Sequence, residues 1–305
     1  MVQTLIQMTL LIACGAAWRY FEPADLEIST VRRVLTSLVY YLLLPAMIIE
    51  VMWQAEMGWQ FLKVIAVGSL SIIVGMGVMV LVLSRLNITR AQKGALILVT
   101  AFPNVTYLGL PVLEQVLGDW ARSVAIQMDL FSGQPLLYTV GIMIARYYGR
   151  ADNGVEKING AVFNTPPFWA AGVALVLNTA QISPPEFIHG TLERLSDGVI
   201  PLMLIALGMA LDWQSFRRRA MSLLWPVVGV KLALMPLVAL GLAGWMVVAP
   251  DIKVATVLEV AMPSGVLCLV LCDRYGLDAP LYAMAVTVTT VLSLLTLPLW
   301  YGVLS

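Results

Sequence analysis

Two short polar stretches, each directly after a proline inside a long apolar run, carry the residue types that could bind a small molecule. A proline has no backbone N–H and its ring clashes with the preceding turn, so Pro103 and Pro263 should each break a helix. The half-helix after each break, expected to begin about Val105 or Gly265, presents N–H groups and a positive dipole end that favour an anion. The side chains add an amide and two hydroxyls that can donate to a carboxylate. The candidate substrate-binding residues are Pro103, Asn104, Val105, Thr106, Pro263, Ser264 and Gly265.

Ionisable residues inside apolar runs form a second group, because each is costly in a membrane and marks a functional site by default. Glu259 lies about one helical turn before the second proline, and Asp129 has Gln134 nearby. Burial favours the protonated form of a carboxyl group, so either acid could load and release a proton and couple transport to it. The alternative is a structural hydrogen bond, or an ion pair with Lys231, the one Lys or Arg deep within a predicted span. The coupling candidates are Asp129, Gln134, Lys231 and Glu259.

The composition places these residues in a lipid bilayer. Of the 305 residues, 60% are hydrophobic and 12% charged, and the mean hydropathy is +0.88, whereas soluble proteins carry roughly 25% charged residues. A helix break survives in lipid only where it lines a cavity. Two interrupted spans in corresponding positions of two halves indicate the binding site of a secondary transporter.

Several other classes of protein are not indicated. The net charge is zero and no basic cluster alternates with aromatic residues, so no nucleic-acid partner is expected. Three cysteines and one histidine without metal-ligand spacing predict neither a metal site nor a cofactor. The sequence has no HExxH motif, P-loop or dinucleotide fingerprint. The histidine, His189, is predicted to lie in a loop, and no enzymatic activity is expected.

The apolar runs predict an all-α polytopic membrane protein, because about 20 apolar residues are needed for each crossing. Ten spans are expected, at approximately 2–18, 32–54, 60–84, 92–117, 121–147, 161–181, 192–212, 222–249, 253–274 and 279–302. The longest polar segment, residues 146–159, separates two halves, 1–150 and 151–305. Thirteen Lys and Arg residues fall in one set of loops and four in the other, which predicts that both termini lie outside the cytoplasm.

The two halves share landmarks. These are Pro45 with Pro201, Lys93 with Lys253, Pro103 with Pro263 and Gly118 with Gly276, each pair separated by about 160 residues. A near-constant separation suggests a duplicated five-span unit. Because five is odd, the second copy enters the membrane upside down, as an inverted repeat whose fourth and ninth spans cross near the midplane.

Several stretches resemble motifs of one transporter family. They are Tyr41–Ala46, Pro103–Pro111, Met262–Gly265, Tyr275–Asp278 and Ser293–Pro298. Together they resemble the auxin efflux carrier family, which includes plant PIN auxin carriers and bacterial malonate and related organic-acid carriers. The resemblance covers nearly the whole chain.

This resemblance implies a ten-span inverted-repeat fold with crossed broken helices, related to bile acid sodium symporters and sodium/proton antiporters. Spans one, two, six and seven would form a scaffold, and spans three to five and eight to ten a mobile transport bundle that moves like an elevator. By position, Pro103, Asn104, Pro263 and Ser264 would form the crossover, with Asn104 contacting substrate. The plant carriers have a polar amide after the second proline where this chain has Ser264-Gly265, and residues 147–159 form a short loop. The resemblance therefore implies a prokaryotic inner-membrane exporter of small carboxylates, such as malonate or auxin-like acids, and a homodimer.

Three other readings stay open. A sodium-coupled symporter could hold its ion with hydroxyls, carbonyls and an acid such as Asp129. A membrane sensor would bind the same ligand without moving it. An intramembrane enzyme would need paired catalytic residues at helical spacing, and the sequence offers no convincing pair.

Overall fold

The computed structural model describes residues 2–21, 26–53, 55, 58–149, 166–210, 221–246 and 248–304. The regular secondary structure within these ranges is helical, and the one β-type contact recorded there is an isolated bridge between Pro103 and Ser264. The predicted boundary between halves, near residue 150, lies outside the described residues, as do the basic residues Arg150, Lys157 and Arg217–Arg219.

Within the described ranges, four continuous helical runs are long and apolar enough to cross a membrane: Ile28–Trp53, Trp59–Ser84, Met221–Trp245 and Ala279–Leu304. The first comprises α2 (Ile28–Leu38), η1 (Val39–Leu43) and α3 (Leu44–Trp53), and the second is α4 (Trp59–Ser84). The third comprises α13 (Met221–Gly229), η6 (Val230–Leu234) and α14 (Met235–Trp245), and the fourth is α17 (Ala279–Leu304). These runs confirm a polytopic membrane protein.

Two predicted spans are interrupted at their prolines. The first consists of α5 (Arg90–Ala101), η2 (Val105–Gly109) and α6 (Leu110–Leu117), and the second of α15 (Pro250–Val260) and α16 (Cys268–Tyr275). Each outgoing half-helix ends at a glycine of positive φ, which is +98° at Gly118 and +65° at Gly276. A side chain is strained in this conformation, so glycine ends both half-helices at low cost.

The remaining helices are shorter. They are α1 (Val2–Phe21), α7 (Ala121–Met128), η3 (Asp129–Gly133), α8 (Gln134–Leu136), η4 (Leu137–Gly141), α9 (Ile142–Tyr148), α10 (Pro166–Thr179), α11 (Glu186–Asp197) and α12 (Val199–Ala210). His189 lies within α11, so its predicted place in a loop was wrong. The predicted span 192–212 included only the second half of this helix, because α11 is amphipathic, with Glu186, Glu193 and Arg194 along its length.

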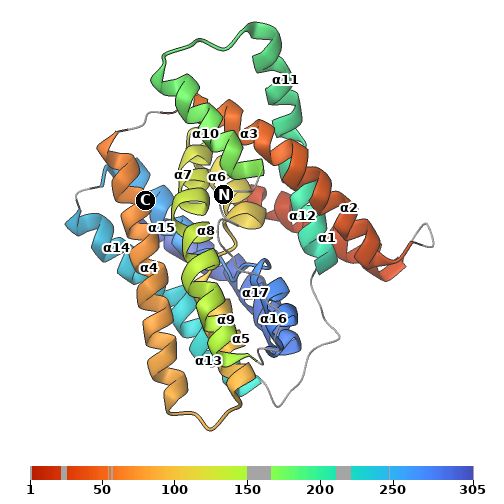
Figure 1. Cartoon of the computed structure of the whole chain (residues 1–305), viewed down its shortest axis with the longest axis vertical. Helices are drawn as coiled ribbons and strands as arrows, with labels where there is room; N and C mark the ends of the chain where they lie inside the picture. Colours follow the sequence, from red (N-terminus) through yellow and green to blue (C-terminus); the bar gives the residue numbers. More distant parts are fainter. Residues whose placement is uncertain are drawn as a thin grey trace.

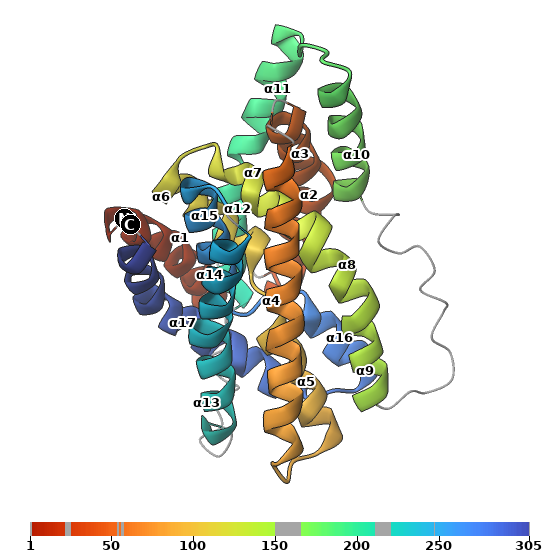
Figure 2. The same cartoon turned by 90° about the vertical axis from the view of Figure 1, so that its left-hand side faces the viewer.

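The helices pack in two groups. In the first, α1 packs along α12, and α3 packs against α10 and α11. In the second, α4 packs against α5 and α14, and α15 packs against α7 and α14. Figure 1 shows α2, α3, α10, α11 and α12 along the top and right of the molecule, and Figure 2 shows α14 running beside α4. The two groups meet where α12 contacts η2 and where α3 contacts α7.

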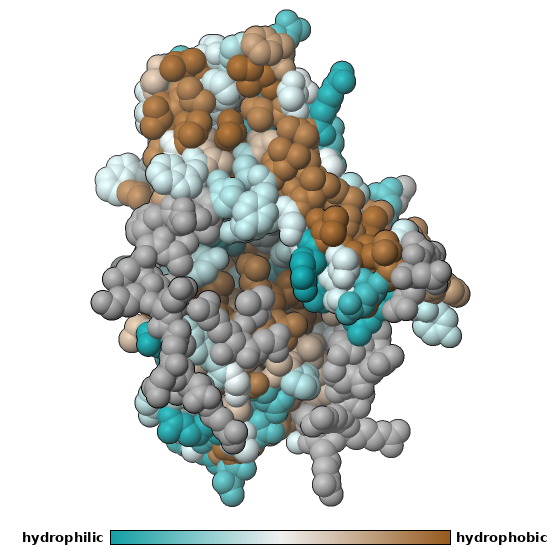
Figure 3. Space-filling model, turned by 45° about the vertical axis from the view of Figure 1, so that its right-hand side comes forward, coloured by the Kyte–Doolittle hydropathy of each residue, from teal (hydrophilic) through white to brown (hydrophobic). Residues whose placement is uncertain are grey.

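Large apolar side chains cover much of the outside. Tyr41, Trp169, Trp225 and Leu299 are each about two-thirds exposed, at 67%, 64%, 68% and 68%. Figure 3 shows an apolar surface over the upper part of the molecule and polar side chains toward the lower end. Apolar surface on this scale suits contact with lipid in a chain that spans the bilayer.

Candidate functional site

The structure brings the two proline breaks together. The Asn104 N–H donates to the Pro263 carbonyl oxygen at 2.7 Å, and the Gly265 N–H donates to the Phe102 carbonyl oxygen at 2.9 Å. These bonds pair Pro103 with Ser264 as an antiparallel bridge. The residues 102–104 and 263–265 are called the crossover below. Here each break satisfies backbone groups of the other, which lipid could not do.

Two residues of α17 hold the second segment of the crossover, residues 263–265, in place. The Ser264 N–H donates to Thr289 Oγ1 at 3.2 Å, and the Tyr282 hydroxyl donates to the Gly265 carbonyl oxygen at 2.5 Å. A Cβ at Gly265 would lie 2.9 Å from the Pro103 carbonyl oxygen, so a side chain there would force the two breaks apart. Neither Thr289 nor Tyr282 was a candidate from sequence, because a lone hydroxyl in an apolar span carries no distinguishing spacing.

Some of the backbone N–H groups at the two breaks are already bonded. Those of Asn104, Ser264 and Gly265 are used in and around the crossover. The second half-helix also begins at Cys268, three residues later than expected. The first half-helix keeps the expected arrangement, since it begins at Val105 and its first helical bond is from the Gly109 N–H to the Asn104 carbonyl oxygen, at 2.9 Å. The amides of residues 105–108 precede that bond and remain available to an anion.

The side-chain amide of Asn104 is buried without a full set of hydrogen bonds among the described residues. It is 3% exposed, and its Nδ2 has no hydrogen-bond partner among the described residues. The buried Ser264 hydroxyl oxygen also lacks one there. An unsatisfied buried polar group costs about 1–3 kcal/mol, so each such group in a native protein needs an explanation. A bound polar ligand or water supplies one for both.

The pocket around the crossover is small in this conformation. It is lined by residues 102–107, Asp129, Gly133, Gln134, Leu137 and residues 265–268, and its volume is about 30 Å³. That space suits one or two water molecules. An organic anion therefore requires the pocket to open.

Asp129 and Gln134 join the first break through Thr106. Asp129 Oδ2 accepts hydrogen bonds from the Thr106 hydroxyl at 2.8 Å and from Gln134 Nε2 at 2.9 Å. Thr106 is thus committed to Asp129 rather than free for substrate. Asp129 also opens the π-helical turn η3, a deviation from α-helix that is frequent at functional sites.

Glu259 and Lys231 lie beside the end of α15, and both are fully buried. Lys231 Nζ donates to the Val260 carbonyl oxygen at 3.2 Å, at the end of α15. Both carboxyl oxygens of Glu259 lack a hydrogen-bond partner in the described part of the chain, and no ion pair between Glu259 and Lys231 is recorded within 4.0 Å. The Glu259 carboxyl group lies where a Cβ at Gly109 would be, so a side chain at that position would require the Glu259 carboxyl group to move.

Two larger cavities lie at opposite ends of the α2–α3 run. The first, the Arg32 cavity, has a volume of about 280 Å³ and is lined by Arg32 and Thr36 of α2, together with parts of α12, η2 and α17 and with Val266, Leu267 and Leu269. The second, the Glu50 cavity, has a volume of about 480 Å³ and is lined by Glu50, Asp119 and Arg122 among others. The crossover pocket shares Tyr107, Val266 and Leu267 with the Arg32 cavity and no lining residue with the Glu50 cavity. In this conformation the crossover therefore adjoins the Arg32 side.

Arg122 links the two helix groups beside the Glu50 cavity. Its guanidinium lies 3.5 Å from the Glu50 carboxylate on α3 and 3.1 Å from the Glu114 carboxylate on α6. It also donates to the Ser196 hydroxyl on α11. Sequence reasoning placed Arg122 only among the loop charges, because contacts between distant helices leave no local pattern.

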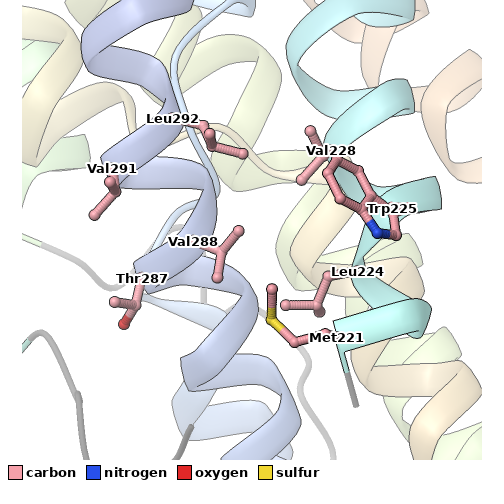
Figure 4. Close-up of a pocket in the computed structure, with 8 residues that line it drawn as sticks. All are labelled: Met221, Leu224, Trp225, Val228, Thr287, Val288, Val291 and Leu292. Carbon is pink, nitrogen blue, oxygen red and sulfur yellow. The ribbon is translucent and has the colours of Figure 1, made fainter. Parts of the chain in front are cut away.

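A further groove, between α13 and α17, differs in chemistry from the crossover. It has a volume of about 330 Å³ and is lined by Met221, Leu224, Trp225, Val228, Thr287, Val288, Val291 and Leu292. Figure 4 shows these mainly apolar side chains facing one another across the groove. None of the described residues that line it offers a charged group to an anion.

Comparisons with known proteins identify the family of this chain. A family model described as a membrane transport protein matches residues 29–159 and 155–301. An uncharacterized transporter of Methanothermobacter thermautotrophicus is 32% identical over 222 residues, which are 72% of this chain and 71% of that protein. An uncharacterized transporter of Methanocaldococcus jannaschii is 25% identical over 282 residues, which are 89% of each chain.

Proposed function

Because this chain belongs to the auxin efflux carrier family of membrane transport proteins, we propose that it is an exporter whose cargo is a small organic anion, such as malonate or an auxin-like carboxylate. The observation that carries the proposal is the buried Asn104 amide, whose Nδ2 has no partner among the described residues. It lies at the start of a half-helix whose first amides are also available. A carboxylate accepts hydrogen bonds from both kinds of donor and is favoured by the positive end of the helix dipole.

The proposed movement is of the elevator type, in a ten-span fold of two inverted repeats. The helices α1–α3 and α10–α12 would form the scaffold, and α4–α9 with α13–α17 would carry the crossover. The packing of the described helices in these two groups supports this division. So do the two cavities at opposite ends of the α2–α3 run, because a shift of the crossover relative to that run would expose it to either one.

For coupling, Glu259 is the stronger of the two acidic candidates. Asp129 is held by two donors, which suits a charged group with a structural role. The carboxyl oxygens of Glu259 are buried without a hydrogen-bond partner in the described residues, and a proton or a sodium ion would satisfy them. We therefore propose proton coupling through Glu259, with sodium coupling as the alternative at the same acid.

The setting follows from the same proposal. The transporter would lie in the inner membrane of a prokaryote as a homodimer, with both termini outside the cytoplasm, as the distribution of Lys and Arg predicts.

The test is uptake of labelled malonate into proteoliposomes, with empty liposomes as the control. A pH gradient at constant sodium and a sodium gradient at constant pH are imposed separately. Saturable uptake driven by the pH gradient is the expected result, and a response to sodium alone would establish the alternative. If neither malonate nor an auxin-like acid enters above the control, the proposed cargo is wrong.

A further inference from the structure

We propose that Arg32 binds the carboxylate of the substrate before it reaches the crossover, and that it does so from one face of the membrane only. This inference rests on the proposed function and assigns its anion-capture residue. Arg32 lies in the first turns of α2 and lines the Arg32 cavity, which adjoins the crossover pocket.

The charge of the cavity is the first argument. Arg32 is the one ionised side chain among the described residues that line it, and the others are apolar apart from the hydroxyls of Thr36, Tyr107 and Tyr282. A single guanidinium in an otherwise neutral, low-dielectric cavity attracts anions strongly. The same fork of N–H donors binds a carboxylate in a bidentate manner.

The second argument is that this guanidinium is available. No carboxylate of the described residues lies within 4.0 Å of Arg32; the ion pairs recorded there belong to Arg122. Arg32 is also only partly buried and lines the cavity, so a solute inside the cavity can contact it. Arg122, by contrast, is held by two glutamates at the other end of the α2–α3 run.

The third argument is the continuity of the path. Tyr107, Val266 and Leu267 line both the Arg32 cavity and the crossover pocket. An anion that leaves Arg32 therefore meets next the pocket that holds the Asn104 amide. At the opposite end, the Glu50 cavity is lined by Glu50, Asp119 and Arg122, and Arg122 is paired with Glu50. The Asp119 carboxylate is then left to oppose recapture of an anion after release.

Sidedness follows from where Arg32 is placed. It belongs to α2, which packs against α12 and not within the group that carries the crossover. In the proposed movement Arg32 stays behind while the crossover shifts. Its contribution to substrate affinity should therefore be confined to the face on which the Arg32 cavity opens.

The experiment compares Arg32→Gln with Arg33→Gln in inside-out and right-side-out vesicles. Arg33 is the next residue along α2, is exposed and does not line the cavity, so its variant is a matched control for charge and position. For Arg32→Gln we expect the KM for malonate to rise about tenfold or more on one face only, as loss of a charge-assisted bond predicts. Arg32→Lys, which keeps the charge, should recover part of the affinity. Equal KM values for the Arg32→Gln and Arg33→Gln variants would overturn the inference.

A binding measurement separates this inference from the proposed function. Thermal stabilisation of the detergent-solubilised protein by malonate alone should be present in the wild type and in Arg33→Gln, and reduced in Arg32→Gln. Binding that depends on Arg32 without any transport would support the inference and contradict the proposed function. Transport and binding that are both unchanged in Arg32→Gln would support the proposed function and contradict the inference. A wild type that neither binds nor transports malonate would overturn the inference and the proposed function together.

Discussion

The backbone N–H of Asn104 donates to the carbonyl oxygen of Pro263 at 2.7 Å, and with the bond from the Gly265 N–H to the Phe102 carbonyl oxygen it pairs the two helix breaks. A break at a proline leaves carbonyl and amide groups that lipid cannot satisfy. Pairing one break with the other removes that cost for the backbone. It leaves the Asn104 side chain pointing into a small pocket with its amide unpaired among the described residues.

Replacing Asn104 by alanine should abolish malonate transport while the protein still folds and inserts. The amide makes no recorded hydrogen bond through Nδ2 in the described chain, so its loss removes the proposed substrate contact without breaking a structural bond of that nitrogen. Uptake into proteoliposomes measures transport, and thermal unfolding measures folding. Asn87→Ala, in the exposed connection between α4 and α5, is the control and should transport normally. Wild-type rates for Asn104→Ala would contradict the assignment.

Gly109→Ala should lower the thermal midpoint, because its Cβ would collide with the Glu259 carboxyl group. Overpacking a buried site typically costs about 1–3 kcal/mol. Gly77→Ala in α4 is the matched control, since nothing lies within 4 Å of a Cβ there and alanine is favoured in a helix.

The double variant Gly109→Ala with Glu259→Ala tests the cause of that loss. If the clash with Glu259 is responsible, the second change should restore part of the midpoint, as a double-mutant cycle would show. Simple addition of two separate losses would indicate another cause.

The sequence predicts where the two helix breaks lie, but it does not predict which groups bond to the backbone there. Pro103 and Pro263 act locally, through a missing N–H and a ring, so their effect is visible in any apolar run. The partners of Ser264 and Gly265 are Thr289 and Phe102, far apart in the chain. Those bonds occupy amides that local reasoning left free, and no spacing rule reveals them.

The sequence also identifies charged residues without predicting their partners. Asp129 and Glu259 were both found from their place in apolar runs, yet only the fold shows that one has two donors and the other none recorded in the described residues. Arg32 and Arg122 lie near span ends, where a basic residue ordinarily reports orientation alone. Arg32 lines a cavity and Arg122 is paired with two glutamates, and this difference arises only from the tertiary structure.

Glu259→Gln should remove the dependence of malonate transport on the pH gradient. Glutamine keeps the shape of the side chain but cannot gain or lose a proton. The charged groups nearest in this region are Lys231 and Asp129, so Asp129→Asn is the comparison, and it should keep its gradient response because Asp129 is held by Thr106 and Gln134. Uptake at a series of imposed gradients measures the response. An unchanged response in Glu259→Gln would make that acid structural.

Glu50→Gln should make the crossover more accessible from the side of the Glu50 cavity. The contact between Glu50 on α3 and Arg122 on α7 joins the two helix groups at 3.5 Å, and an elevator movement must break it in every cycle. Both side chains are largely buried, with exposed fractions of 16% and 11%. Removing the charge of one partner should therefore destabilise this conformation by about 1–3 kcal/mol, between the values for exposed and buried pairs.

Cys268 can report the change, because it lines the crossover pocket and is buried in this conformation. In a background where the exposed Cys14 is replaced by serine, a membrane-impermeant maleimide added on that side should label Cys268 about fivefold faster or more in Glu50→Gln. Glu193→Gln, on the exposed face of α11, is the control and should label at the wild-type rate. Equal labelling rates in the two variants would mean that the Arg122 contact does not hold the crossover closed to that side.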